Sequence, residues 1–471
     1  MTSELMRCLP AVDAILGLSD LTDIVETYRR EYLVRWINSI LDDIRQEIRA
    51  NHHQVSAVRE DFLRMIQERL QDKIRRLENQ GVTPVINAAG VVIHTNLGRS
   101  PLADQVLRRL AHGLAGYTDV EYDLAAGRRG HRDTHAAAVL RELMECEDAT
   151  AVNNNAGAVF LILHALARGG EVIVSRSELV EIGGSFRIPD IMRESGAILK
   201  EVGTTNKTYA RDFEQAISDQ TRLILHVHQS NFALVGFTAA PSLEELVSVA
   251  RRHDIPLVVD AGSGYLFEIP DLPLHNEPVI RRLLDGGVDL VCFSADKLMG
   301  GPQAGLILGR RHLVQRIRED PLMRVLRLDK VISLGLTETL KLYFRKDFAE
   351  RVPIFAMMRL APAVIRARCS RFRTRLLRGI TGAADRIKVR SDRSVIGGGT
   401  TPGEELPGYV VVLRPSGGQA HKLERFLRQG RPPVIARTED DELRLDLRTV
   451  TAAEEKILLG RLREAFQQGL W

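Results

Sequence analysis

Apolar side chains recur at helical spacing through the first 80 residues. The spacing i, i+3, i+4 is that of a helix with one buried face, and it is clearest at Ile37, Ile40, Leu41, Ile44 and Ile48. This segment contains one proline, Pro10, and almost no glycine. The pattern predicts a helical N-terminal module over residues 1–80, and a capping or oligomerisation bundle is its simplest role.

From Val82 the pattern changes to short runs rich in Val and Ile that alternate with helical stretches. Four runs are clear: GEVIVSRSE (170–178), TRLILHVHQS (221–230), DIPLVVDAG (254–262) and GVDLVCFSAD (287–296). Strands alternating with helices predict an α/β domain with a mostly parallel sheet, here over residues 81–385. Ligands of such sheets bind beyond the carboxyl ends of the strands, where the polar loops of this chain also fall, so we expect one pocket there.

The C-terminal part has a different character. Residues 386–471 alternate strands such as YVVVLRP with helices such as QAHKLERFLRQG, which predicts a small α+β domain. Just before it, RLAPAVIRARCSRFRTRLLR (359–378) carries seven arginines and no acid. Such a run is either a solvated helix face or a surface for an anionic partner such as a phosphate backbone.

Charge and cysteine content exclude several classes of protein. The formal net charge is +4 over 471 residues, which indicates no nucleic-acid partner without local clustering. The four cysteines lie far apart, so we expect reduced thiols, no disulfide framework and no metal site. We expect no signal peptide, because the first residues lack a basic region followed by a long apolar core. We also expect no membrane span, because the most apolar stretch, AVFLILHALA (158–167), is too short for one. We therefore expect a cytoplasmic protein.

A lysine follows the last of the four strand-like runs, at the start of a glycine-rich loop. The loop SADKLMGGPQAG extends from Ser294 to Gly305 and contains Lys297. Glycines let the backbone approach a ligand closely. A desolvated lysine can lose its proton near neutral pH and form a Schiff base with an aldehyde cofactor. A lone loop lysine is usually a solvated surface residue, so this interpretation depends on its neighbours.

Three further features fit a cofactor held by that lysine. The Ser294 hydroxyl can bind its phosphate, and Asp260, at the end of the strand PLVVD, can pair with a protonated pyridine nitrogen. Asn155, Ala156 and Gly157 open a helix pattern whose first N–H groups form an anion site for the same phosphate. Together they predict pyridoxal 5'-phosphate and a fold type I, aspartate-aminotransferase-like transferase.

Two histidines lie on the strand pattern upstream of Asp260. Alternation places His226 and His228 on the same face. His228 is expected to stack on the cofactor ring, with Ser230 also at the cofactor, and a structural histidine is the alternative. His226 is expected to be structural.

At this point a resemblance to a known family becomes specific. The chain resembles the bacterial selenocysteine synthases over essentially its whole length, including the helical extension and the small C-terminal domain. The segments that carry it are INAAGVVIHTNLGRSPLA (86–103), YTDVEYDLAAGRRGHR (117–132), NNNAGAVFLIL (153–163), SRSELVEIGGSFRIPDIM (175–192), EVGTTNKT (201–208), HQSNFALVGF (228–237), DAGSG (260–264) and SADKLMGGPQAGLI (294–307).

The resemblance implies conversion of L-seryl-tRNA(Sec) into L-selenocysteinyl-tRNA(Sec), an L-seryl-tRNA(Sec) selenium transferase activity. Water would be lost by β-elimination to give a dehydroalanyl-tRNA, to which selenium from selenophosphate is then added. Lys297, released as an amine beside the seryl Cα, is the expected proton carrier. Whether selenophosphate arrives free or from selenophosphate synthetase stays open.

The resemblance also implies a set of anion-binding arginines. They fall on Arg99, Arg324 and Arg327, and the i, i+3 spacing of the last two predicts one helix face. A planar guanidinium suits a compact anion such as selenophosphate. Asp296, beside the lysine, resembles an active-site residue of the family. Ala233 departs from the pattern, since a longer polar residue is expected there.

The family's tRNA binding is attributed to the N-terminal module and to a homo-oligomeric ring of dimers. In this chain, residues 1–80 carry 12 basic and 14 acidic side chains, so tRNA binding there would need a local cluster such as Lys73, Arg75 and Arg76. The arginine run at 359–378, with Arg368 and Arg371 among its members, could supply backbone contacts elsewhere. We expect neither DNA nor a membrane as partner.

Two other functions fit parts of the sequence. A pyridoxal-phosphate lyase acting on a free amino acid or amino sugar acid could share the lysine and aspartate loops, but would have less need of the helical extension and of Arg99, Arg324 and Arg327 together. A tRNA-binding chaperone without catalysis is the third candidate, and the presence of Lys297 and Asp260 argues against it.

Overall fold

The computed structural model describes residues 2–50, 58–182, 186–380, 382–398, 400 and 403–470. The chain forms two compact units, Met1–Pro84 and Val85–Trp471. Residues 183–185, within the predicted motif at 175–192, lie outside the described residues. Among the described helices, none combines the length and the apolar character that crossing a membrane requires.

The N-terminal unit is helical. Its helices are α1 (Thr2–Arg7), α2 (Val12–Leu16), α3 (Thr22–Thr27), α4 (Arg30–Arg49) and α5 (Arg59–Glu78). The predicted apolar face of α4, including Ile37 and Ile44, packs in one core with Phe62, Ile66 and Leu70 of α5. Two long amphipathic helices thus stabilise each other by burying their apolar faces together.

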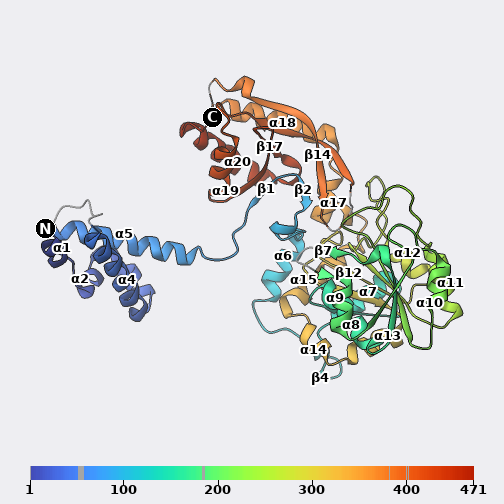
Figure 1. Cartoon of the computed structure of the whole chain (residues 1–471). Helices are drawn as coiled ribbons and strands as arrows, with labels where there is room; N and C mark the ends of the chain where they lie inside the picture. Colours follow the sequence, from blue (N-terminus) through green and yellow to red (C-terminus); the bar gives the residue numbers. More distant parts are fainter. Residues whose placement is uncertain are drawn as a thin grey trace. The chain divides into compact units, whose positions relative to one another are not determined.

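The larger unit contains a seven-stranded sheet with helices on both faces (Figure 1). The strand order is β5 (Asp148–Val152), β13 (Gly305–Gly309), β12 (Leu290–Ser294), β11 (Leu257–Gly262), β10 (Thr221–Val227), β6 (Glu171–Ser175) and β9 (Ile198–Val202). Neighbouring strands are parallel except β13, which is antiparallel to both β12 and β5. The four predicted strand runs become β6, β10, β11 and β12, as expected.

Two hydrophobic cores lie on opposite faces of this sheet, as alternation along the strands requires. One core takes side chains from α6 (Asp104–Gly113), α7 (Thr134–Met144), α10 (Ala210–Ala216), α11 (Leu243–Arg252), α12 (Ile280–Asp285), α15 (Lys330–Leu342) and α17 (Pro353–Met358). The other core takes them from α8 (Asn155–Ala167), α9 (Ile188–Ser195) and α13 (Arg311–Glu319). This three-layer α/β/α arrangement covers both faces of the parallel strands.

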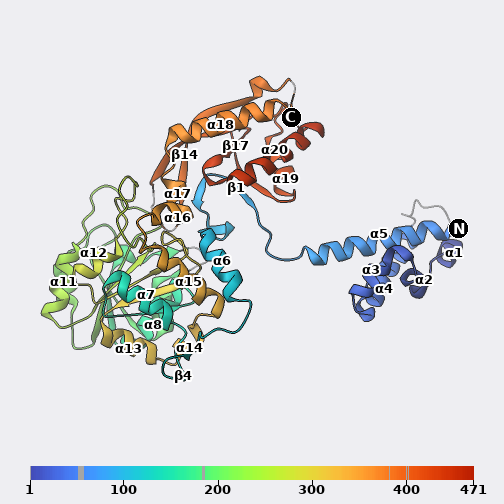
Figure 2. The same ribbon diagram turned by 180° about the vertical axis from the view of Figure 1, so that it is seen from behind.

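A second, six-stranded sheet is built from both ends of the larger unit (Figure 2). Its order is β1 (Ile86–Ala88), β16 (Val434–Glu439), β17 (Glu442–Asp446), β15 (Glu405–Leu413), β14 (Ile387–Gly397) and β2 (Val91–Ile93). The helices α18 (Pro362–Leu377), α19 (Ala420–Arg428) and α20 (Ala452–Gln467) share its core. The structure therefore places residues 86–93 and α18 with the C-terminal part, although the boundary predicted at 385/386 assigns them to the catalytic domain.

Short elements complete the described chain. They are α14 (Leu322–Leu326), α16 (Phe348–Arg351) and the two-stranded pairs β3 (Tyr122–Asp123) with β4 (Arg128–Arg129) and β7 (Glu181–Ile182) with β8 (Phe186–Arg187).

The arginine run at 359–378 forms most of α18, and part of it is used for packing. Arg368 donates hydrogen bonds to Glu455 and to the Val450 carbonyl. Arg373 donates to the Ile387 and Ala384 carbonyls. These two arginines therefore anchor α18 to its neighbours, while Arg371 is exposed.

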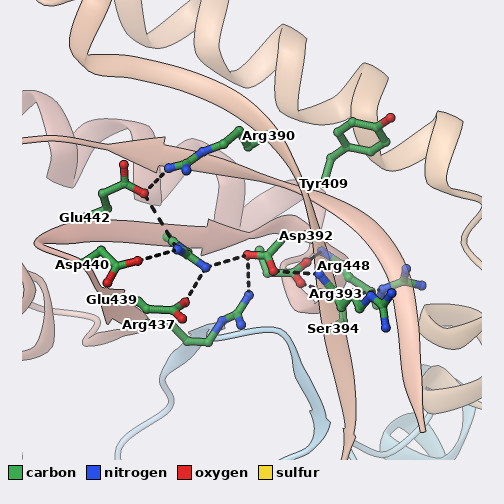
Figure 3. Close-up of polar contacts among 12 residues, drawn as sticks. Arg390, Asp392, Arg393, Ser394, Tyr409, Arg437, Glu439, Asp440, Glu442 and Arg448 are labelled. Carbon is green, nitrogen blue, oxygen red and sulfur yellow. Dashed lines mark hydrogen bonds and ion pairs between the residues drawn. The ribbon is translucent and has the colours of Figure 1, made fainter.

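Ion pairs cover one face of the small sheet (Figure 3). Glu442, almost fully buried, is paired with Arg390 and Arg414, and Asp392 is paired with Arg437 at 3.0 Å. Burial alone would raise the pKa of Glu442, but the two guanidinium groups hold this pKa below its usual value. The carboxylates of Glu442 and Asp392 thus each have a cationic partner that offsets the free-energy cost of removing them from water.

Arg448 ties the small sheet to the segment that follows α17. It is 2 % exposed. Its guanidinium donates to the Ser394 hydroxyl and to four backbone carbonyls, those of Met357, Met358, Leu360 and Pro407. No apolar side chain can satisfy those acceptors.

Replacing Arg448 by methionine keeps the volume of the side chain and removes its hydrogen bonds. We expect Arg448→Met to lower the free energy of unfolding by about 3–5 kcal/mol, because it leaves buried carbonyls without a donor. Denaturant unfolding measures this loss. The matched control is Arg393→Met, since the Arg393 side chain is 72 % exposed and paired with Glu405 at the surface. Equal stability of the two variants would contradict the anchoring role of Arg448.

Candidate active site

Three neighbouring strands bring the predicted chemical residues to one edge of the large sheet. Asp260 lies on β11, opposite Val227 at the end of β10 and Cys292 near the end of β12. The backbone N–H of His228, the residue after β10, donates to the Asp260 carbonyl at 2.9 Å. The predicted convergence at the carboxyl ends of parallel strands is therefore present.

Asp260 is buried, with 3 % exposure, and its carboxylate is held by two donors. The side-chain amide of Asn155 donates to Oδ1 at 2.8 Å, and the Gly262 backbone N–H donates to the same oxygen at 3.0 Å. Burial raises the pKa of Asp260, while Asn155 and the nearby Lys297 charge act against that rise. The carboxylate is thus oriented from α8 and from its own strand.

The start of α8 differs in detail from the predicted anion site. Asn154 caps the helix and accepts the Gly157 N–H at 2.8 Å, so that N–H is already bonded. The Asn155 side chain is directed to Asp260. The backbone N–H groups of Asn155 and Ala156 lie in the first turn of α8, where no intrahelical carbonyl can accept them.

Lys297 lies on the loop after β12 and is 6 % exposed. Its carbonyl accepts hydrogen bonds from the Ser100 hydroxyl at 2.6 Å and from the Gly300 N–H at 2.9 Å, which fix the loop. Gly300 has a φ of +70°, and a Cβ there would lie 2.4 Å from Val352, so this turn requires glycine. Ser294 is the last residue of β12 and is buried.

Burial lowers the pKa of Lys297, and the charge of Arg99 lowers it further. The carboxylates of Asp260, Asp296 and Glu277 act in the opposite direction. A lysine with a lowered pKa is a better nucleophile toward an aldehyde at neutral pH. The surroundings of Lys297 therefore fit the predicted role.

Arg99 and Asp296 form an ion pair beside this lysine. Nη1 of Arg99 lies 2.6 Å from Oδ2 of Asp296, whose side chain is 8 % exposed. The other oxygen, Oδ1, is buried and has no hydrogen-bond partner among the described residues. The pair brings two predicted residues together and leaves one carboxylate oxygen available.

Arg324 and Arg327 do not share a helix face, contrary to the spacing-based prediction. The helix α14 ends at Leu326, and Arg327 has an extended backbone that bridges to Val152 of β5. Proline at the start and only five helical residues leave no second turn to carry Arg327. The structure still places both arginines on one cavity.

That cavity has a volume of about 480 Å³, and five arginines line it together with the acidic residues Glu121, Asp133 and Asp320. Arg129, Arg132 and Arg318 line it together with Arg324 and Arg327. Glu121 pairs with Arg327 at 2.7 Å and with Arg132 at 3.1 Å. Arg99 is not among the lining residues of this cavity.

Arg132, Arg318 and Glu121 were not predicted from the sequence as site residues. Arg132 and Glu121 lie within the segment 117–132 that carries the resemblance, so that segment held the available signal. Arg318 bonds to Asp148 at 3.0 Å and to Asp133 at 3.3 Å, which holds it in place from the helix α13. No local pattern marks these long-range pairs.

The two histidines have separate carboxylate partners. His226 Nδ1 lies 2.9 Å from Glu178, and His228 Nε2 lies 3.3 Å from Glu277. Ser230 is 2 % exposed and lies beside Gly262. Both glutamates are buried and neither was predicted, because they come from loops far from the histidines in sequence.

Residues 85–451 match the family model of L-seryl-tRNA selenium transferase, SelA. The chain belongs to this family. It is 41 % identical to the L-seryl-tRNA(Sec) selenium transferase of Carboxydothermus hydrogenoformans, with 96 % of both chains covered. It is 42 % identical to that of Aquifex aeolicus, over 98 % of this chain and 99 % of the relative.

The fold is shared more widely than the family. D-glucosaminate-6-phosphate ammonia-lyase aligns with a TM-score of 0.56 at 20 % identity, covering 83 % of this chain and 98 % of that one. This likeness concerns the fold alone. The prediction of a fold type I transferase with a mostly parallel sheet is confirmed.

The residues at the strand ends fit pyridoxal 5'-phosphate, the predicted cofactor of this selenium transferase family member. A buried carboxylate that is already oriented by two donors suits a protonated pyridine nitrogen. Lys297 offers a buried amine of lowered pKa, and the first turn of α8 offers N–H groups for a phosphate. The donor set therefore matches the ring, the aldehyde and the phosphate of the cofactor.

Asn155 can be tested without touching the groups predicted to contact the ring or the aldehyde. We expect Asn155→Ala to weaken pyridoxal phosphate binding by about 10- to 100-fold, as loss of a group that orients a binding residue commonly does. Fluorescence titration of the cofactor-free protein measures the dissociation constant. Asn153→Ala is the matched control, because Asn153 bonds through its backbone N–H to Leu326. Equal affinities would show that Asp260 needs no donor from α8.

The His226 and Glu178 pair predicts a pH dependence of stability. Burial opposes a charge on His226, but Glu178 outweighs it and raises the histidine pKa above its usual value. The stabilisation is therefore fully present below the unfolded-state pKa of about 6.5 and is lost as pH rises through the folded-state pKa. We expect the wild type to lose more stability than Glu178→Gln between about pH 6 and about pH 8.5. Denaturant unfolding at each pH measures this loss. An equal change in the free energy of unfolding for the two proteins over this pH range would refute the assignment.

Proposed function

We propose that this protein converts L-seryl-tRNA(Sec) into L-selenocysteinyl-tRNA(Sec), with pyridoxal 5'-phosphate as cofactor and selenophosphate as selenium donor. Relatives about 40 % identical over nearly the full chain are L-seryl-tRNA(Sec) selenium transferases. The observation that carries the proposal is that Lys297 and Asp260 are both buried and interact electrostatically, in a site that also holds the Arg99 and Asp296 pair. An amine beside an oriented carboxylate is the arrangement that such chemistry needs.

The cofactor, when bound, supplies an electron sink for the electron pair released when the seryl Cα proton is removed. Asp260 would hold its ring nitrogen protonated, and Asn155 keeps that carboxylate in position. Ser294 and the backbone N–H groups of Asn155 and Ala156 would bind the phosphate. His228 would pack against the ring, with Ser230 beside it.

Lys297 would first carry the cofactor through its amine and then move the proton at the seryl Cα. Its lowered pKa leaves a larger fraction of the amine uncharged and able to accept that proton. The seryl hydroxyl leaves from Cβ as water. The selenium of selenophosphate would then bond to the same carbon while a proton returns to Cα, and water would cleave the P–Se bond and release phosphate. Arg99 and Asp296, paired at 2.6 Å beside Lys297, would orient the groups at that carbon.

The arginines are proposed to bind the selenium donor. Selenophosphate is a compact, multiply charged anion, and guanidinium groups bind such anions through two parallel hydrogen bonds. Arg324 and Arg327 line one basic cavity of about 480 Å³, which supports their role. Arg99 would act from its position beside Lys297.

The tRNA and the assembly state are the broader part of the proposal. The helical unit before Val85 would bind tRNA, with Lys73 and Arg76 as candidate contacts. Large apolar side chains exposed on the second unit, Tyr117, Leu124, Val235 and Phe237, support an oligomer, proposed as a ring of dimers. On α18, Arg371 remains a candidate for phosphate contacts, whereas Arg368 and Arg373 are engaged within the fold.

The rival function is a lyase for a free amino acid or amino sugar acid. The fold is compatible with it, because an ammonia-lyase shares the architecture. Sequence identity to that enzyme is 20 %, about half the identity to the selenium transferases. The balance therefore favours the tRNA-dependent reaction.

A spectroscopic experiment tests the proposed function. We expect the purified holoprotein to absorb in the visible range and this band to change on adding seryl-tRNA(Sec), but not on adding seryl-tRNA(Ser). With selenophosphate present, selenocysteinyl-tRNA(Sec) should form, and Lys297→Ala should abolish both effects, because no other lysine among the described residues is buried.

Each contrary result has a separate meaning. A visible absorption band that changes with neither tRNA would refute the selenium transferase function and favour the lyase. Absence of the band in protein supplied with the cofactor would refute the cofactor assignment itself.

A further inference from the structure

A second cavity is lined by His228 and shares no lining residue with the arginine-lined cavity. It has a volume of about 390 Å³. Ionisable side chains in its lining are Glu178, His226, His228, Glu277 and Glu404. Burying three carboxyl groups around two histidines costs desolvation free energy unless each carboxyl group has a polar partner.

Glu178 has a complete set of partners. One of its oxygens lies 2.9 Å from His226 Nδ1, and the other accepts the Val227 backbone N–H at 2.9 Å. This carboxylate therefore fastens the end of β10 and needs no further ligand.

Glu277 is different, although its side chain is only 1 % exposed. Its Oε1 lies 3.3 Å from Nε2 of His228, while its Oε2 is buried and has no hydrogen-bond partner among the described residues. The residue belongs to the loop between β11 and α12, where its N–H bonds to the Leu274 carbonyl. A carboxylate this deeply buried is held there for its one polar contact, which is the imidazole of His228.

Glu404 approaches the same place from the segment before β15. Its Oε2 is also buried and unbonded among the described residues. Burial raises the pKa of Glu404 and the charge of Glu277 raises it further, while the N–H groups of Asn276 and His275 oppose the rise. The carboxyl groups of Glu404 and Glu277 therefore lie close enough to act on each other.

His228 and Glu277 both interact electrostatically with groups of the proposed cofactor site. The charge of His228 acts to lower the pKa of Asp260, and the charge of Glu277 acts to raise the pKa of Lys297. The pair thus lies close to the two groups that would hold the cofactor.

We propose that Glu277 is a positioning residue, whose buried carboxylate accepts the Nε2–H of His228 and thereby fixes the plane of the imidazole against the cofactor ring. This inference rests on the proposed function, which places the cofactor on Lys297. Holding Nε2 in one hydrogen bond leaves Nδ1 and the ring face as the surfaces that His228 presents elsewhere. Without Glu277 the imidazole can rotate, and its contact with the ring loosens.

Glu277→Gln removes the charge and keeps the shape of the side chain. We expect it to weaken cofactor binding by about tenfold, in the range seen when a group that orients a ligand is lost, and to reduce the visible circular dichroism of the bound cofactor. That signal reports the fixed asymmetric surroundings of the ring, which a loss of global stability alone does not change. His228→Ala should show both effects.

The double variant Glu277→Gln/His228→Ala separates action through His228 from a direct effect. If Glu277 acts through the imidazole, the double variant is no weaker in binding than His228→Ala alone. Additive losses would refute the positioning role. If Glu277→Gln does not fold, Glu277→Asp replaces it, because its shorter side chain keeps the charge but moves it away from His228. We then expect a smaller loss of cofactor affinity and of visible circular dichroism.

Two matched controls come from the same cavity. Glu178→Gln removes a buried carboxylate that lies 2.9 Å from His226, and Glu404→Gln replaces the half-buried carboxyl group of Glu404 by an amide. We expect both to retain the dichroism and the cofactor affinity within about twofold. Controls that lose as much as Glu277→Gln would show a general effect of cavity charge and overturn the proposal.

The wild-type spectrum distinguishes failure of this inference from failure of the proposed function. A wild type that takes up no pyridoxal phosphate refutes the cofactor assignment. A wild type with a normal cofactor band and dichroism, matched in both by Glu277→Gln, refutes the positioning role alone.

Discussion

The oriented, buried carboxylate of Asp260 is the constraint on which the site depends. A carboxylate at 3 % exposure is stable only with donors in place, and here they come from Asn155 on α8 and from Gly262 on the same strand. Lys297, from the next strand's loop, adds its charge to the balance. Three segments far apart in sequence must therefore meet correctly before the carboxylate can be buried, so the fold and the site are specified together.

Local patterns were sufficient to predict the centre of this arrangement. Asp260 ends a run of apolar β-branched residues and Lys297 precedes consecutive glycines, and both signals lie within about ten residues. Parallel strands then bring their carboxyl ends to one edge, so the residues meet without further information. The strands β10, β11 and β12 carry this geometry, and each falls within its predicted run.

Long-range pairing explains what the sequence could not show. The strand β1 pairs with β16, about 350 positions later in the chain, and no local composition indicates that choice. Arg327 leaves the helix α14 because its backbone is needed for a bridge to Val152, which overrides the i, i+3 spacing. The number of arginines on α18 likewise does not show which of them are exposed, and Arg368 is instead paired with Glu455 inside the fold.

Two side chains, Glu404 and Arg448, connect the small sheet to the site. Glu404 enters the cavity beside His228 from the residue just before β15. The position of β15 is set in turn by Arg448, which bonds to the Pro407 carbonyl on that strand and to the carbonyls of Met357 and Met358 next to the large sheet. A shift of the small sheet would therefore move a carboxyl group relative to Glu277. The C-terminal sheet is thereby part of the electrostatic wall of the site as well as a neighbouring domain.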